Sequence, residues 1–124
     1  MSSNTTGELD LLKLQAEICK ALADPKRLFI IKELSKGEQS VGELAGKLGV
    51  RPANVSQHLA ILRDKEVVEA RREATVVYYR LTDAKIGEAC GLVQQILLAR
   101  IRKNSKLAEQ SQEYESRQPG KEAR

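Results

Sequence analysis

The stretch RPANVSQHLAIL, residues 51–62, has the periodicity of an α-helix with a single apolar stripe. At about 100° per residue, Val55, Leu59 and Leu62 project within about 60° of one another, so we expect them to face a core. The opposite half carries amides, a serine and the only histidine of the chain, where an ordinary surface helix carries lysines and glutamates. Gln57 lies nearly opposite the apolar stripe, and His58 lies at the flank of the polar half.

The composition describes a chain of modest size. Its 124 residues, 41% hydrophobic and 31% charged, suit one globular domain with mobile ends. No run approaches the roughly 18 apolar residues that span a bilayer, and residues 1–6 lack the features of a signal peptide, so we expect a cytoplasmic protein with no membrane partner. Cys19 and Cys90 are too few for a disulfide scaffold. The net charge of +4 fits a polyanionic partner but does not identify one.

The segments before residue 51 predict three helices. Residues 9–22 have helical apolar spacing, and Asp24 with Pro25 is typical of a helix start, which predicts a second helix that ends near Gly37. Ser40 and Glu43 fit a capping box for a third helix. Residues 49–50 then form a short break before the helix at 52–64. Two short helices joined by a tight glycine-containing turn indicate a helix-turn-helix.

Beyond residue 66 the periodicity changes to two. Residues 67–72 and 75–81 are predicted to be strands joined at a hairpin tip, and Thr82 or Asp83 is predicted to cap a last helix that ends near residue 108. We expect disorder at 1–8, one domain at 9–108 and a polar, disordered tail at 109–124. The predicted fold is mainly α with minor β content: a winged helix-turn-helix with a two-stranded β-hairpin wing and long terminal dimerisation helices.

The polar residues of the helix at 52–64 predict an interface with double-stranded DNA. Amide side chains can bind an adenine edge bidentately, and basic residues beside the helix and at the hairpin can contact phosphates. The predicted contact residues are Arg51, Asn54, Ser56, Gln57, His58, Arg63, Arg71 and Arg72. Two alternatives remain open: these polar residues only hydrate a surface helix, or the domain is a winged-helix protein-interaction module without DNA binding.

The residues do not indicate an enzyme. The chain has one histidine, no glycine-rich phosphate loop and no recognisable pairing of a nucleophile with a base. We therefore expect no catalytic residues.

Four motifs carry a family resemblance. The runs ALADPKRL (21–28), ELA (43–45), NVSQHL (54–59) and VYYRLTD (77–83) resemble the ArsR/SmtB family of winged-helix repressors, in unbroken order over about residues 9–105. The resemblance implies a homodimer formed by the terminal helices, with the helix at 52–64 in the major groove of a palindromic operator. It also implies repression that is released by a metal, a metalloid or a reactive small molecule.

The sequence departs from that family at its familiar metal sites. The run Cys-Val-Cys-Asp-Leu, which binds metalloids in relatives, is SVGEL here at residues 40–44. At the second site Asp83 is present, but Lys85, Ile96 and Ala99 replace the other ligands. Zinc is usually bound by about four ligands. We therefore expect no metal site and no cofactor, and the effector stays unidentified.

A smaller departure lies at the hairpin tip. Ala74 stands where relatives usually have glycine. If Ala74 adopts a positive φ, the strain costs of order 1 kcal/mol.

The last helix is apolar on more than one side, which suggests burial by a second subunit. One apolar stripe of this helix consists of Ile86, Cys90, Val93, Leu97 and Ile101. Leu92 and Ile96 lie on a different side of the helix. Gly87 and Gly91 share a neighbouring face, and each costs roughly 1 kcal/mol in a helix relative to alanine. We expect them to permit close approach at the dimer contact.

The two cysteines allow two interpretations. Cys19 and Cys90 lie on apolar stripes of the helices that the family pairs at its interface, so each could be a small buried hydrophobe. Alternatively they form a thiol sensor, through a disulfide or polysulfide or as part of a soft-metalloid site. Both interpretations stay open from the sequence.

Overall fold

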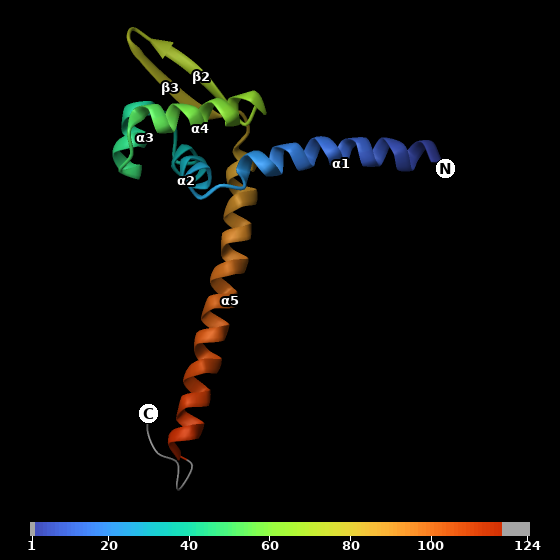
Figure 1. Cartoon of the computed structure of the whole chain (residues 1–124), viewed down its shortest axis with the longest axis vertical. Helices are drawn as coiled ribbons and strands as arrows, with labels where there is room; N and C mark the ends of the chain where they lie inside the picture. The colour runs from blue at the N-terminus through green and yellow to red at the C-terminus, as the bar shows by residue number, and fades with distance from the viewer. Residues whose placement is uncertain (1, 118–124) are drawn as a thin grey trace. The chain divides into compact units, whose positions relative to one another are not determined.

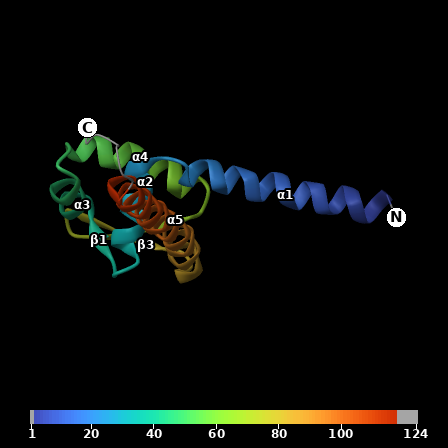
Figure 2. The same cartoon turned by 90° about the horizontal axis from the view of Figure 1, so that it is seen from below.

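The computed structural model describes residues 2–117, which form five helices and three strands (Figure 1). In chain order these are α1 (Ser2–Leu22), α2 (Pro25–Leu34), β1 (Gln39–Ser40), α3 (Val41–Leu48), α4 (Pro52–Asp64), β2 (Val68–Glu73), β3 (Val76–Leu81) and α5 (Ala84–Arg117). The chain divides into two compact units after Cys90, so the second unit is the remainder of α5. Within the first unit, α2, α3 and α4 gather around one core with the strands along its side (Figures 1 and 2).

The predicted helix caps are confirmed by their hydrogen bonds. The carboxylate of Asp24 accepts from the backbone N–H groups of Lys26 and Arg27 at 2.9 and 3.2 Å, which begins α2 at Pro25. Ser40 and Glu43 form the reciprocal capping box of α3, with bonds of 3.1 and 3.0 Å. Local side chains therefore determine where these helices begin.

The turns and the start of α5 also follow from local chemistry. Gly49 ends α3 in the left-handed region, with φ of 69°. Of the two candidate caps for α5, Asp83 accepts from the N–H of Lys85 at 2.9 Å. The hydroxyl of Thr82 instead donates to the carbonyl of Glu66 at 2.7 Å.

The core lies between α2, α3, α4 and the start of β2. Val55, Leu59 and Leu62 are fully buried, as the apolar stripe of residues 51–62 predicts. They pack with the other buried apolar residues of the cluster, Ala21, Ile30, Ile31, Leu34, Leu44, Ala45, Val67 and Val68. Because one face of α4 is buried in this core, its opposite face points outward.

A buried carboxylate joins α2 to α3. Glu33 pairs with Lys36 at 2.8 Å and with Lys47 of α3 at 3.0 Å. The hydrogen bond from Lys36, followed by that from Lys47, lowers the pKa of Glu33 to about 2, so the carboxylate stays charged. The cluster fixes α3 beside α2 and thereby supports the turn into α4.

The sheet has three strands, whereas the sequence predicts two. β1 pairs antiparallel with β3, Gln39 with Tyr79 and Ser40 with Tyr78, and β2 pairs along the other edge of β3. β1 has two residues, too few to display a period of two. It is held by tertiary contacts, because Gln39 is buried and its side-chain amide donates a hydrogen bond to the carbonyl of Glu33 at 2.6 Å.

Both terminal helices extend beyond their predicted bounds. α1 begins at Ser2 although disorder is expected at 1–8, and α5 continues to Arg117 although the tail is expected to begin at 109. An established helix propagates easily through polar residues, and no proline interrupts residues 84–117. Residue 1 and residues 118–124 lie outside the described residues. None of the helices at 2–117 combines the length and apolar character that crossing a bilayer requires.

Packing within the chain explains why residue 87 is a glycine. A Cβ at Gly87 would lie 2.1 Å from Oγ and 3.2 Å from Cβ of Ser35, at the end of α2. A Cβ at Gly91 would meet nothing within 4 Å. Gly87 therefore permits close packing of the first turns of α5 on α2, and the dimer-contact hypothesis remains for Gly91 alone.

The hairpin tip carries the backbone strain that the sequence suggests. Ala74 has φ of 54°. We expect Ala74→Gly to raise the free energy of unfolding by about 0.5–1 kcal/mol, because relief of the left-handed strain exceeds the added freedom of the unfolded chain. Urea unfolding measures the change. Ala60→Gly, which places the same substitution in α4, is the control and should destabilise by about 1 kcal/mol; a loss of stability in both variants would contradict the expectation.

Candidate nucleic-acid interface

The outer face of α4 is open to solvent. Ser56, Gln57, Ala60 and Ile61 are exposed, and Ile61 retains 43% of its accessible surface. Two small exposed alanines, Ala53 and Ala60, lie beside an amide and a hydroxyl and leave a surface that can approach another molecule closely. The structure thus brings two predicted contact residues, Ser56 and Gln57, to one uncovered face.

Both ends of α4 carry exposed arginines. Arg51 is the N-cap, makes no side-chain capping bond, and precedes Pro52 at the first helical position. Arg63 lies in the last turn and is also exposed. A helix N-terminus favours an anion, so this end of α4 suits a phosphate.

Asn54 is only partly exposed. Its Oδ1 atom is buried and has no hydrogen-bond partner among the described residues. A buried acceptor without a partner is costly. Of the predicted amides, Gln57 is therefore the one that projects freely.

His58 turns away from the outer face toward the start of α2. Its side chain is 16% exposed, and its Nδ1 atom lies 3.3 Å from a guanidinium nitrogen of Arg27 and 4.0 Å from Oδ1 of Asp24. Arg27 also donates through Nε to the carbonyl of Ala21, at 2.6 Å, in the last turn of α1. The backbone N–H of Arg27 lowers the pKa of the Asp24 carboxyl. Arg27 was not among the predicted site residues, because no local pattern indicates its contacts with Ala21 and His58.

The two predicted wing arginines have different surroundings. Arg71 donates to the carboxylate of Glu38 from Nη2 at 2.6 Å and to that of Glu73 from Nη1 at 2.8 Å. Its guanidinium lies 4.8 Å from the ring centre of Tyr78, the residue opposite it on β3. Arg72 is exposed and makes no ion pair within residues 2–117. The wing therefore presents Arg72 more freely than Arg71.

The pKa values of this wing cluster keep it charged. The hydrogen bond from Arg71 lowers the pKa of Glu38, and the same bond, followed by that to Glu73, raises the pKa of Arg71. Glu38 lies in the connection between α2 and β1, so this ion pair crosses β3 and fastens the hairpin to the body of the domain. No local sequence signal indicates this pairing across 33 residues.

The two thiols are both free. Cys19 is exposed, and Cys90 is partly buried against the core cluster. Burial, followed by the charge of a nearby Cys19 thiolate, raises the pKa of the Cys90 thiol.

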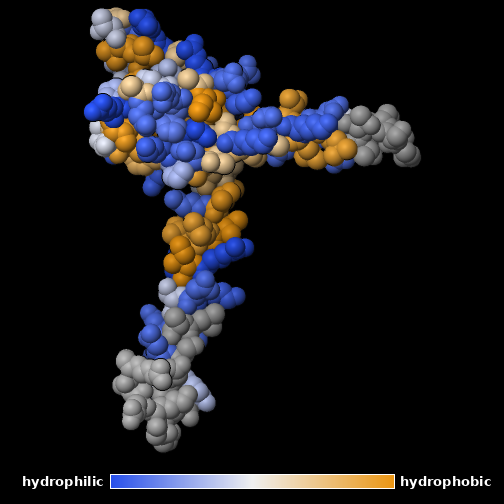
Figure 3. Space-filling view, viewed as in Figure 1, coloured by the Kyte–Doolittle hydropathy of each residue, from blue (hydrophilic) through white to orange (hydrophobic). Residues whose placement is uncertain are grey.

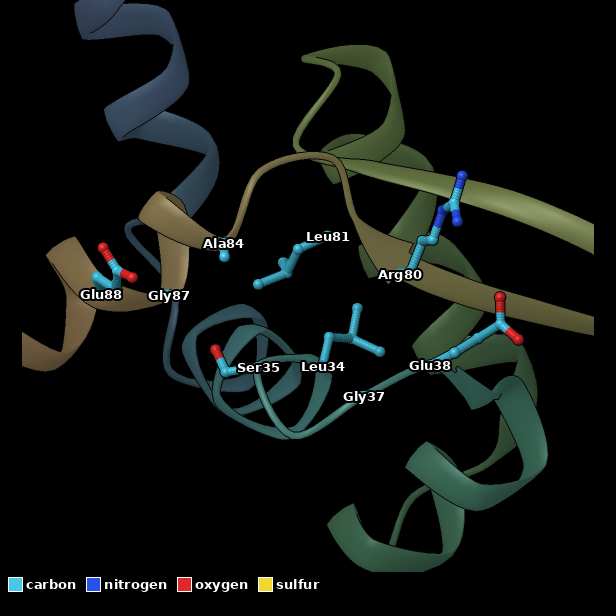
Figure 4. A pocket seen from close by; sticks show the side chains of 9 residues that line it. All are labelled: Leu34, Ser35, Gly37, Glu38, Arg80, Leu81, Ala84, Gly87 and Glu88. Carbon is cyan, nitrogen blue, oxygen red and sulfur yellow. The ribbon is translucent and has the colours of Figure 1, made fainter.

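Two observations concern metal and small-molecule binding. Within the described part of the chain no three histidine, cysteine or acidic side chains gather as a metal site. A pocket of about 420 Å³ lies between the end of α2, the end of β3 and the start of α5 (Figure 4). Two of its charged side chains are already paired, Arg80 with Glu69 and Glu38 with Arg71.

The fold and this interface define a winged helix-turn-helix transcriptional regulator, and comparison with known proteins gives its family. Residues 24–70 match the family model described as "Bacterial regulatory protein, arsR family". A biofilm growth-associated repressor of Xylella fastidiosa is 38% identical over 84 residues, 68% of this chain and 74% of the repressor. The chain belongs to the arsR family of bacterial regulatory proteins.

Other relatives agree with this assignment. A biofilm growth-associated repressor of Agrobacterium fabrum is 46% identical over 70 residues, 56% of this chain and 60% of that protein. The chain therefore spans less than two thirds of that relative. A solution structure described as a homodimeric winged helix-turn-helix DNA-binding domain from Mycobacterium bovis superposes with a TM-score of 0.70 at 33% identity, covering 77% of this chain and 89% of that one.

Proposed function

We propose that the protein is a cytoplasmic, homodimeric repressor that binds a palindromic duplex operator. The observation that carries this proposal is the uncovered face of α4, where Ser56 and Gln57 project beside small alanines. Such a face can enter the major groove, where an amide distinguishes base pairs by its paired donor and acceptor. In this proposal Arg51, Arg63 and Arg72 contact the phosphates on either side.

Apolar surfaces on two helices support the dimer. Side chains on α1 and on α5 remain exposed as hydrophobic patches (Figure 3). On α1 these are Leu9, Leu11, Leu12, Leu14 and Ile18, and on α5 they are Leu92, Val93, Ile96, Leu97, Leu98 and Ile101. Contiguous exposed apolar surface on this scale marks an interface. A twofold dimer would present two copies of α4 to two operator half-sites.

Selection from a random duplex pool tests the function directly. The protein should enrich duplexes that contain an inverted repeat, with half-site centres about one helical turn apart. Fluorescence anisotropy on the enriched duplex should show affinity that falls steeply with salt. Enrichment of no sequence, together with no binding at low salt, would overturn the proposal.

The protein-interaction alternative is less well supported. A groove-binding face should lack negative charge, and the outer face of α4 has no acidic side chain before Asp64 in its last turn. Two of the relatives, those of Xylella fastidiosa and Agrobacterium fabrum, are named repressors. DNA binding is therefore the function we propose.

The two wing arginines should respond differently to substitution. Each phosphate contact contributes about 0.9 to the slope of log affinity against log salt. We expect Arg72→Gln to reduce that slope by about 0.9 per protomer, because Arg72 is unpaired within residues 2–117. Arg71→Gln should leave the slope near the wild-type value and lower the unfolding temperature, because it removes the pairs to Glu38 and Glu73. Equal slope changes in both variants would contradict this assignment.

We also propose that Cys19 and Cys90 form the thiol pair through which an effector acts. Oxidation by diamide would take two protons and two electrons from the thiols and join their sulfur atoms, linking α1 to the start of α5. Operator binding should fall on oxidation and return with dithiothreitol, while Cys19→Ser and Cys90→Ser should not respond. An undiminished response in either variant, or none in the wild type, would favour the alternative that both are packing residues.

A further inference from the structure

A single side chain links the end of α1 to the flank of α4. The guanidinium of Arg27 donates through Nε to the carbonyl of Ala21 and lies 3.3 Å from Nδ1 of His58 through a terminal nitrogen. Asp24 caps α2 beside them, and its Oδ1 lies 4.0 Å from the same imidazole atom. Because α1 carries an exposed apolar face and α4 carries the groove-facing residues, this cluster lies between the two surfaces that the proposed function uses.

The chemistry of the contact determines the protonation of the imidazole. A guanidinium can only donate hydrogen bonds, so Nδ1 of His58 accepts from Arg27 only when the imidazole is neutral and its proton is on Nε2. A second proton on Nδ1 would place two donors and two positive charges against each other. The same proton would favour Asp24, whose carboxylate is the acceptor on the other side.

Two charged side chains are in contact with His58. Within the described residues, Arg27 and Asp24 are the ionisable groups in contact with the imidazole, and both belong to the start of α2. α1, α3 and β2 also pack against α4, but none places a charged group in ion-pair or hydrogen-bond contact with His58. Protonation therefore exchanges Arg27 for Asp24 as the partner of Nδ1.

We propose that His58 is a positioning residue, which in its neutral form accepts from Arg27 and on protonation turns to Asp24, so that the flank of α4 is reseated and acid weakens operator binding. This inference rests on the proposed DNA-binding function. Gln57 precedes His58 directly on α4, so a small change in the seating of this flank alters how the amide meets a base edge. His58 then affects DNA affinity without touching DNA.

The sign of the pH effect separates this role from a phosphate contact. An imidazole is the side chain that gains charge between about pH 8 and pH 5. A protonated histidine that touched phosphate would strengthen binding on acidification, whereas loss of the Arg27 contact would weaken it. We expect the wild-type affinity for its selected duplex to fall about tenfold from about pH 7.5 to about pH 5.5 at constant ionic strength, the equivalent of about 1.4 kcal/mol.

His58→Asn provides the decisive variant, because its amide oxygen can accept from Arg27 near the position of Nδ1 and does not titrate. We expect His58→Asn to bind like wild type at about pH 7.5 and to lose the acid effect. Arg27→Met should bind more weakly at both pH values. Gln57→Ala is the matched control on the same helix: it should lower affinity at both pH values and keep the wild-type pH profile.

Two further measurements keep the test decisive if a variant folds poorly. The chain has one histidine, so in tag-free wild-type protein its imidazole can be followed alone by NMR. The backbone amides of Gln57 and Leu59 should shift with the same pH dependence as the imidazole. Tight binding that is equal at both pH values, or that strengthens in acid, would overturn the role of His58 alone. Failure to select any duplex at about pH 7.5 would overturn the proposed function instead.

Discussion

Leu97→Glu is expected to yield a monomer that loses operator affinity by at least about 100-fold, because two half-site contacts then no longer act together. Leu97 lies on α5 among exposed apolar side chains and retains 55% of its accessible surface. In a twofold interface the substitution occurs twice, and each copy buries an unpaired carboxylate at a high cost. Analytical ultracentrifugation reports the mass, and anisotropy reports the affinity.

The control for this variant adds the same charge to the polar side of α5. Gln95 is exposed and shares that side with Glu88 and Arg102, so Gln95→Glu should remain dimeric and bind the operator. A Leu97→Glu protein that stays dimeric at micromolar concentration would show that this face does not form the interface.

Gln57→Ala is expected to weaken specific binding by about 1–3 kcal/mol and to relax the preference at one base pair of each half-site. Gln57 is exposed on the outer face of α4, so its removal leaves the core intact and the unfolding temperature unchanged. Competition between duplexes that differ at single base pairs measures both the loss and the position of the preference.

The matched control is Gln112→Ala, which removes an exposed amide from the far part of α5 and should leave affinity and base preference unaltered. Gln57→Ala with wild-type affinity for every duplex tested would exclude Gln57 as a base contact. A uniform loss across all sequences would instead assign it to the DNA backbone.

The structural features that depend on residues nearby in the chain could be predicted from the sequence. The caps at Asp24 and Ser40 and the left-handed turn at Gly49 depend on groups two to four residues away, and all three are present. The buried stripe of α4 follows from helical periodicity alone, so its solvent-facing side could be anticipated as well. A positive φ at Ala74 was raised only as a condition, because relatives usually have glycine there, and Ala74 has φ of 54°.

The orientation of the predicted contact residues could not be read in the same way. Arg71 and Arg72 are adjacent basic residues in the sequence, yet Glu38 engages only the first. His58 is next to Gln57, yet it faces Arg27 while Gln57 faces solvent. In each case the partner comes from a distant part of the chain, and neither partner has a distinctive spacing.

The sequence by itself determined the helices of the helix-turn-helix, the wing strands and the exposed amide on α4, because these follow from periodicity, capping and turn chemistry within a few residues. Only the tertiary structure decided that β1 joins the sheet, that Gly87 packs on Ser35, and which polar side chains are held by neighbours. The physical reason is that a hydrogen bond between residues some thirty positions apart depends on how the elements pack.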